Sequence, residues 1–202
     1  EFEILTGIKS FGKIKSIEFN VMHGRKMSGL VDRLKRNGYQ TSAVIAADKG
    51  YYNSPNAYKS IGFDSLVFLK EVYPFSENDA VVFDGDLFDY SRRKIESSRA
   101  GEGKPQLNYI LGMYGHLPYQ RDTKKRPDRV YVKGGNEKVR KISNQFYYRT
   151  REVAKYIDFL LDHDPDSLIY ITSDHLPPII TRDIRYKYNI YQNISVATAG
   201  LI

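Results

Sequence analysis

The chain has 202 residues, of which 41% are hydrophobic and 27% charged, and this composition excludes a disordered polypeptide and fits one domain with a hydrophobic core. Its 31 lysines and arginines outnumber its 24 acidic residues, and the resulting formal charge of +7 favours anionic partners such as phosphate groups or anionic lipid. Cysteine is absent, which excludes disulfides, thiolate metal sites and a cysteine nucleophile.

The first third of the chain alternates helical and extended patterns. Apolar residues at helical spacing predict a helix over 24–37, and the short β-branched run 40–46 predicts a buried strand. A segment rich in Gly, Asn and Pro at 48–55 predicts a loop, which leads into a helical turn at 57–61. A helix followed by a strand is typical of α/β proteins.

The rest of the chain continues this alternation. A basic stretch within 84–100 is compatible with a helix, and the apolar run 106–113 predicts a strand. The segment 120–140 is rich in Lys, Arg, Asp, Pro and Gly, so we expect a solvent-facing, mobile insertion. A wide apolar stripe predicts a helix over 144–161, and 167–172 is predicted as a central strand.

Two adjacent residues at the end of that last strand are the strongest candidates for chemistry. Asp174 and His175 precede a Leu-Pro-Pro sequence, and a carboxylate beside an imidazole suits Zn²⁺ or Mn²⁺. In open α/β sheets, ligands bind beyond the carboxyl ends of strands. On chemistry alone, a loop cap or a hydrogen-bonded pair is an equally open interpretation of these two residues.

The other histidines are weaker candidates. His116 follows a glycine in the loop 114–119, where its imidazole could meet a ligand or bond a neighbouring carbonyl. His23 and His163 are interpreted as structural. An acidic cluster opens the segment 84–100 and is interpreted as a solvated turn that caps a helix; its members are Asp84, Asp86 and Asp89.

Five motifs, taken together and in order, resemble one family. They are Glu1–Gly7, Gly38–Thr41, Tyr51–Asp64, Met113–Tyr119 and Ser173–Pro178. This order is similar to the sulfatase-like branch of the alkaline phosphatase superfamily, and most similar to lipoteichoic acid synthases and phosphoglycerol transferases. The resemblance covers nearly the whole chain.

The resemblance implies a three-layer α/β/α fold around a mixed, mostly parallel central sheet, formed by a single domain over residues 1–202. It implies a divalent metal, Mn²⁺ or Zn²⁺ with Mg²⁺ as a further option, held in part by Asp174 and His175. It also implies substrate binding by His116, with Asp48 and Tyr52 retained from the family pattern.

The same resemblance places the Thr nucleophile and a further acidic ligand upstream of Glu1, so we expect the chain alone to be inactive. Thr6 matches a structural threonine of the motif. Ala46 and Ser54 stand where the synthases carry a His and an Arg that hold the substrate headgroup, which puts glycerol-phosphate specificity in question.

The implied function is metal-dependent transfer or hydrolysis of a phosphoglycerol- or phosphoethanolamine-like group in cell-surface glycan or lipid biosynthesis, through a Thr-phosphate intermediate. The expected partners are an anionic phospholipid donor and a glycan or lipid acceptor, without nucleic acid. The expected location is the extracytoplasmic face of a bacterial membrane, in a membrane-anchored parent enzyme. Two alternatives are a sulfatase and a non-catalytic basic module that binds polyanions.

Overall fold

The computed structural model describes residues 1–9, 18–22, 24–74, 76–99, 103–131 and 133–173. These residues form one sheet of parallel strands in the order β2–β1–β3, with bounds β2 (Ser65–Phe68), β1 (Gln40–Ile45) and β3 (Gln106–Leu111). Val44 of β1 lies opposite Val67 of β2 and Ile110 of β3. The predicted α/β class is confirmed, because helices separate these parallel strands along the chain.

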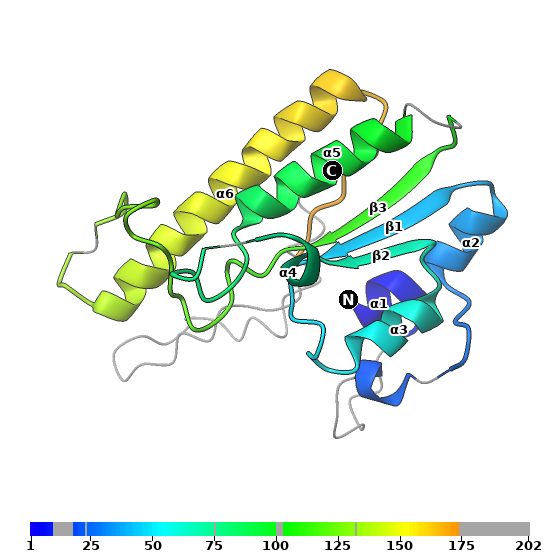
Figure 1. The fold of residues 1–202 in the computed structure, drawn as a ribbon, viewed down its shortest axis with the longest axis horizontal. Coiled ribbons are helices and arrows are strands. Elements are labelled where there is room, and N and C mark those ends of the chain that lie inside the picture. Colours follow the sequence, from blue (N-terminus) through cyan, green and yellow to red (C-terminus); the bar gives the residue numbers. More distant parts are fainter. Residues whose placement is uncertain (10–17, 23, 75, 100–102, 132, 174–202) are drawn as a thin grey trace.

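Helices cover both faces of the sheet and give three layers (Figure 1). One face carries two long helices, α5 (Asp84–Arg99) and α6 (Glu137–His163). The other face carries three shorter helices, α1 (Phe2–Thr6), α2 (Leu30–Arg36) and α3 (Ser54–Ile61). The remaining short elements are η1 (Glu18–Val21) and α4 (Leu69–Val72).

Strand β1 separates two hydrophobic cores. Ala43 and Ile45 belong to the core that includes residues of α3, which we call the α3-side core. Val44 and Ala46 belong to the core that includes Leu87 of α5, which we call the α5-side core. Successive side chains of a strand point to opposite faces, which explains this alternation. The β-branched run that predicted a buried strand therefore contributes side chains to the cores on both faces of the sheet.

Several predicted bounds shift. The helix expected over 24–37 begins only at Leu30, because Gly29 before it is extended and lies against α1: a Cβ on Gly29 would meet the Leu5 carbonyl oxygen at 2.6 Å. Helix α6 begins earlier than expected, at Glu137, where the Asn136 side chain accepts a hydrogen bond from the Val139 amide at 3.1 Å.

The strand predicted over 167–172 is wrong. None of these residues is in a strand, and Leu168 and Tyr170 are 96% and 62% exposed. An apolar run favours an extended segment, but a strand forms only where another strand supplies its hydrogen bonds. No described strand pairs with this segment, and Leu168, Tyr170 and Ile171 are exposed.

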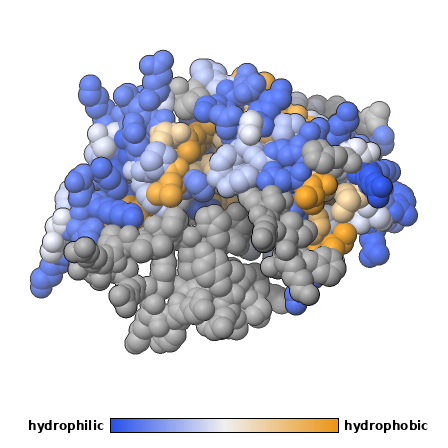
Figure 2. Space-filling model, turned by 90° about the horizontal axis from the view of Figure 1, so that it is seen from below, coloured by the Kyte–Doolittle hydropathy of each residue, from blue (hydrophilic) through white to orange (hydrophobic). Residues whose placement is uncertain are grey.

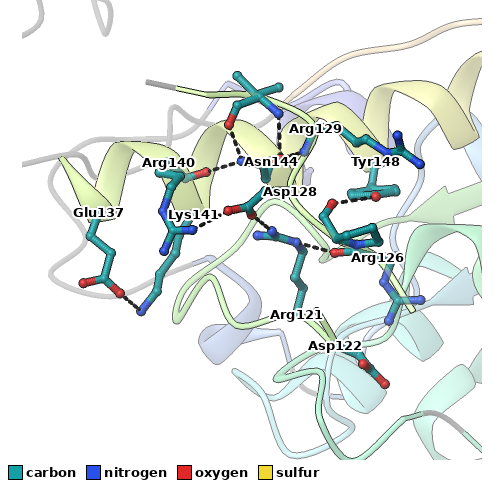
Figure 3. A network of polar contacts seen from close by, with 12 residues as sticks. Arg121, Asp122, Arg126, Asp128, Arg129, Glu137, Arg140, Lys141, Asn144 and Tyr148 are labelled. Atoms are coloured by element: carbon teal, nitrogen blue, oxygen red, sulfur yellow. Dashed lines mark hydrogen bonds and ion pairs between the residues drawn. The ribbon is translucent and has the colours of Figure 1, made fainter. Parts of the chain in front are cut away.

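The segment 120–140 is not solvent-facing throughout, contrary to expectation. Arg121 and Asp122 are buried, and Arg121 pairs with Asp128, which also pairs with Arg140 of α6 (Figure 3). Asn144 of α6 is fully buried and bonds the backbone of 129–130 in both directions. Ion pairs and side chain–backbone hydrogen bonds thus hold part of this segment against α6. Its mobility stays a prediction.

The described surface is mostly polar. On the face shown in Figure 2, hydrophilic residues cover most of the described area and hydrophobic residues form small separate patches. Among the described helices, none combines the length and apolar character needed to cross a bilayer.

Candidate functional site

A cavity of about 300 Å³ lies where the loops after β1 and β3 meet. It is lined by acidic, aromatic, aliphatic and small polar side chains: Glu1, Phe2, Glu18, Phe19, Ala47, Tyr51, Tyr52, Ser54, Tyr58, Leu111, Met113 and His116. We call it the candidate pocket. It occupies the carboxyl edge of parallel strands, where α/β proteins bind ligands.

The loop after β1 carries backbone conformations that are uncommon for side-chain-bearing residues. Tyr52 and Asn53 have φ angles of 46° and 47°, in the left-handed region. The Asn53 side chain donates to the carbonyls of Phe19 and Met22 at 2.8 and 2.9 Å. These two bonds hold η1 against the loop, and they help to offset the cost of the left-handed backbone at the pocket wall.

The loop after β3 supplies His116. Its backbone amide donates to the Met113 carbonyl at 2.9 Å, and its Nδ1 lies 3.0 Å from the Leu117 carbonyl oxygen. Its ring stands edge-to-face against Tyr51, with ring centroids 6.3 Å apart. The two loops therefore meet through these rings, and an imidazole lies where it can donate a hydrogen bond to an anionic ligand.

An acid and a phenol form the inner end of the pocket. The buried Tyr58 hydroxyl donates to Glu1 Oε2 at 2.5 Å, and its ring packs edge-to-face on Phe19 at 5.2 Å. Burial raises the pKa of Tyr58 and the Glu1 carboxylate raises it further, so the hydroxyl remains a neutral donor. Glu18 adds a second carboxylate to the lining.

The sequence-predicted substrate residues are only partly brought together. Tyr52 and His116 line the same pocket. Asp48 lies in the loop after β1, but its carboxylate accepts from the Gly50 amide and pairs with Lys70, both at 3.0 Å, and it is not among the lining residues. The Gly50 hydrogen bond and then Lys70 lower the pKa of Asp48.

The predicted metal ligands, Asp174 and His175, lie outside the described residues. Within the described ranges, no three His, Asp or Glu side chains gather in a way that could hold a metal ion. Metal binding by this pair therefore stays a prediction.

Asp84 is a residue whose environment the sequence interpretation missed. It begins α5 as expected, but it is 1% exposed rather than solvated. It accepts from the Tyr114 amide at 3.3 Å, next to the loop that carries His116, and lies 3.6 Å from Arg149 of α6. Burial raises its pKa to about 6, against the opposing effect of Arg149. Gly112 makes room for it, since a Cβ there would meet Asp84 Oδ1 at 2.8 Å.

Other pocket residues also escaped the sequence analysis. Glu18, Phe19 and Tyr58 carry no local motif that marks a ligand site, and their approach depends on how η1 and α3 pack. Ser54, noted only as a departure from the family pattern, lines the pocket and is buried at the start of α3. Tyr51 begins the motif Tyr51–Asp64, where only its position beside Tyr52 indicates a role.

Comparison with known proteins identifies relatives of the chain. A family model described as Sulfatase matches residues 1–195. An uncharacterized protein of Haemophilus influenzae is 31% identical over 128 residues, which cover 59% of this chain and 23% of that protein. A putative cyclic beta-1,2-glucan modification protein of Rhizobium meliloti is 26% identical over 190 residues, 90% of this chain and 28% of that protein. The chain thus spans less than a third of either relative.

Solved structures share the fold at low sequence identity. The lipoteichoic acid synthase LtaP of Listeria monocytogenes has a TM-score of 0.68 and 16% identity, covering 80% of this chain and 39% of that one. The Streptococcus pyogenes phosphoglycerol transferase GacH, in complex with sn-glycerol-1-phosphate, has a TM-score of 0.60 and 14% identity, covering 81% and 44%. A Vibrio parahaemolyticus protein of the alkaline phosphatase superfamily has a TM-score of 0.56 and 18% identity, covering 78% and 37%.

Proposed function

The chain belongs to the sulfatase family, as its motif order predicted, and on that premise we propose that the candidate pocket binds the phosphorylated group of a substrate. The whole enzyme would transfer this group to an acceptor or release it by hydrolysis. One observation carries the proposal: Tyr52 and His116 reach the same cavity from two different loops at the carboxyl edge of the sheet.

The size of the candidate pocket limits what it can hold. Its volume of about 300 Å³ is at the lower end of the range for small-molecule sites. A phosphoglycerol or phosphoethanolamine headgroup fits such a volume, whereas the acyl chains of a phospholipid donor must remain outside. The proposed ligand is therefore the headgroup of a phospholipid donor.

The lining residues offer complementary chemistry to the two ends of such a headgroup. His116 would donate a hydrogen bond to a phosphoryl oxygen. This bond would contribute more to affinity than a bond between neutral groups, because the acceptor is charged. Glu1 and Glu18 would accept from a glycerol hydroxyl or pair with an ethanolamine ammonium. Tyr58 would keep the Glu1 carboxylate in position.

The acceptor and the location belong to the same proposal. LtaP is named a lipoteichoic acid synthase, GacH a phosphoglycerol transferase, and the Rhizobium relative a glucan modification protein. These names support a glycan or lipid acceptor. We propose that the reaction takes place at the extracytoplasmic face of a bacterial membrane. Asp174 and His175 remain the proposed metal ligands, for Mn²⁺ or Zn²⁺.

The test uses the intact gene product, because the chain spans less than a third of its curated relatives. Diacylglycerol release is measured from phosphatidylglycerol and phosphatidylethanolamine, with p-nitrophenyl sulfate as the sulfatase arm. We expect His116→Ala to lower kcat/KM for a phospholipid by about tenfold to a hundredfold, the cost of one charged hydrogen bond. His163→Ala, at the far end of α6, is the matched control.

Three outcomes would contradict this proposal: equal rates for His116→Ala and His163→Ala, turnover of the sulfate ester alone, or no turnover of any phosphorylated substrate. The metal part has its own measurement. Bound manganese and zinc are quantified by mass spectrometry in the intact protein and in Asp174→Ala, which we expect to lose metal.

A further inference from the structure

An open surface depression of about 510 Å³ lies between β2 and α5. It is lined by hydroxyl, aromatic and basic side chains: Ser65, Val67, Tyr73, Tyr90, Arg93, Lys94 and Ser97. We call it the α5 groove. Its two tyrosines pack against the α5-side core, whereas Phe19 and Tyr58 of the candidate pocket belong to the α3-side core. The sheet therefore separates the groove from the candidate pocket.

The groove is a consequence of strand and helix periodicity. Ser65 and Val67 are two residues apart in β2, so they share one face of the strand. The α5 residues recur at spacings of three and four along one side of the helix, facing that strand; they are Tyr90, Arg93, Lys94 and Ser97. Tyr73, directly after α4, also lines the groove.

The described lining of the groove carries two cations and no carboxylate. Lys94 is half-buried and donates to the Ser65 hydroxyl at 2.7 Å, and Arg93 lies one residue before it. Burial lowers the pKa of Lys94, because the charged amine has lost part of its hydration. An anion bound beside this amine would replace the lost hydration with a direct charge interaction.

The aromatic residues shape the rest of the groove. The rings of Tyr73 and Tyr90 are half-buried and stand edge-to-face, with centroids 6.5 Å apart. The Arg93 guanidinium lies over the Tyr73 ring, 5.6 Å from its centroid. This stacking orients the Arg93 donors beside an amphipathic surface, which suits a ligand with an apolar ring face and polar edges.

We propose that the α5 groove is a binding site for an acidic saccharide, with its anionic group on Lys94 and Arg93 and a sugar ring against Tyr73 and Tyr90. Two neighbouring cations fit one phosphate or carboxylate group. A nucleic acid requires a longer basic track that contacts several phosphates. The site is independent of the headgroup binding proposed for the candidate pocket.

The test measures binding of glucose 6-phosphate to the chain by titration calorimetry, with glucose, inorganic phosphate and a short single-stranded DNA as comparison probes. Lys94→Met keeps most of the aliphatic stem and removes the charge. We expect it to weaken glucose 6-phosphate binding about tenfold, the effect of one charge-assisted contact. Lys141→Met, an exposed lysine of α6 paired with Glu137, is the matched control and should bind like the wild type.

Two further variants separate the parts of the site. Tyr90→Leu should weaken glucose 6-phosphate more than inorganic phosphate, because only the former carries a sugar ring. Because glucose 6-phosphate carries a phosphoryl group, the candidate pocket could also bind it, and His116→Ala removes that contribution while Lys94 stays in place. Binding that persists in His116→Ala and is lost in Lys94→Met belongs to the groove, so the two proposals fail separately.

The proposal is overturned if Lys94→Met and Lys141→Met bind glucose 6-phosphate equally. It is also overturned if glucose or inorganic phosphate binds as tightly as glucose 6-phosphate, since the site would then need only one half of the ligand. Tighter binding of the DNA, lost in Lys94→Met, would assign the groove to nucleic acid instead.

Discussion

Replacing Asp84 by Asn should change how the stability of the chain depends on pH. Asp84 is 1% exposed, and burial raises its pKa from 3.8 to about 6 despite the nearby Arg149. Because the folded-state pKa lies above the unfolded value, the stability contributed by proton binding is fully present below about pH 4 and is lost as pH rises through about 6. Asn keeps the shape without the ionisation.

The expected change in stability follows from the change in the pKa of Asp84 on folding. A difference of about 2 pKa units at about 1.4 kcal/mol each corresponds to about 3 kcal/mol, in which the attraction of Arg149 is already included. We therefore expect Asp84→Asn to be more stable than the wild type by up to about 3 kcal/mol near neutral pH. The difference should shrink towards zero near pH 4, where both side chains are uncharged.

The assay is urea unfolding followed by circular dichroism, repeated from about pH 4 to about pH 8. Asp89→Asn is the matched control, since its carboxylate lies on the same helix, is 56% exposed and pairs with Arg92. It should stay within about 0.5 kcal/mol of the wild type at every pH. A stability difference for Asp84→Asn that does not change with pH, or that is destabilising at neutral pH, would refute the reasoning.

Two further predictions concern packing. Gly29→Ala should lower the free energy of unfolding by about 1 to 3 kcal/mol, because the added Cβ would meet backbone atoms of α1. Gly50→Ala is the control, since its Cβ would meet only the Asp48 carboxylate at 3.6 Å. It should be near neutral in the same urea titration. Asn144→Ala should lower the free energy of unfolding by about 1 to 3 kcal/mol, since the part-buried amide and carbonyl groups at 129–130 lose their partner. Hydrogen exchange at 129–130 should rise, and unchanged protection would contradict this role.

Local periodicity accounts for much of the fold. The β-branched run at β1 and the apolar stripe of α6 are properties of adjacent residues, so a sequence reveals them without tertiary information. The position of His116 and Tyr52 at one pocket follows from a topological rule, since the loops after parallel strands meet at one edge. The first inference needs only the pattern of adjacent residues, and the second needs only the knowledge that the strands are parallel.

Two of the failures share a physical cause, which is that polar residues find partners far along the chain. Asp84 seemed solvated because its neighbours in sequence are polar, yet its surroundings come from Tyr114 and Arg149, far along the chain. Arg126 lies in a charged segment expected in solvent, but it is buried in an ion pair with Asp79. Charge indicates exposure only when no distant opposite charge is available, and one sequence does not reveal that pairing.

Residues that shape the candidate pocket differ from residues that determine the stability of the fold. The left-handed Tyr52 and Asn53 each carry a conformational cost on the order of 1 to 3 kcal/mol, which the bonds from Asn53 to η1 and the packed α3-side core help to offset. A pocket whose walls are held in this way is already shaped before a ligand arrives, so binding requires little reordering. Substitutions in the two loops should therefore change affinity more than stability, while substitutions at Asp84 or Asn144 should do the reverse.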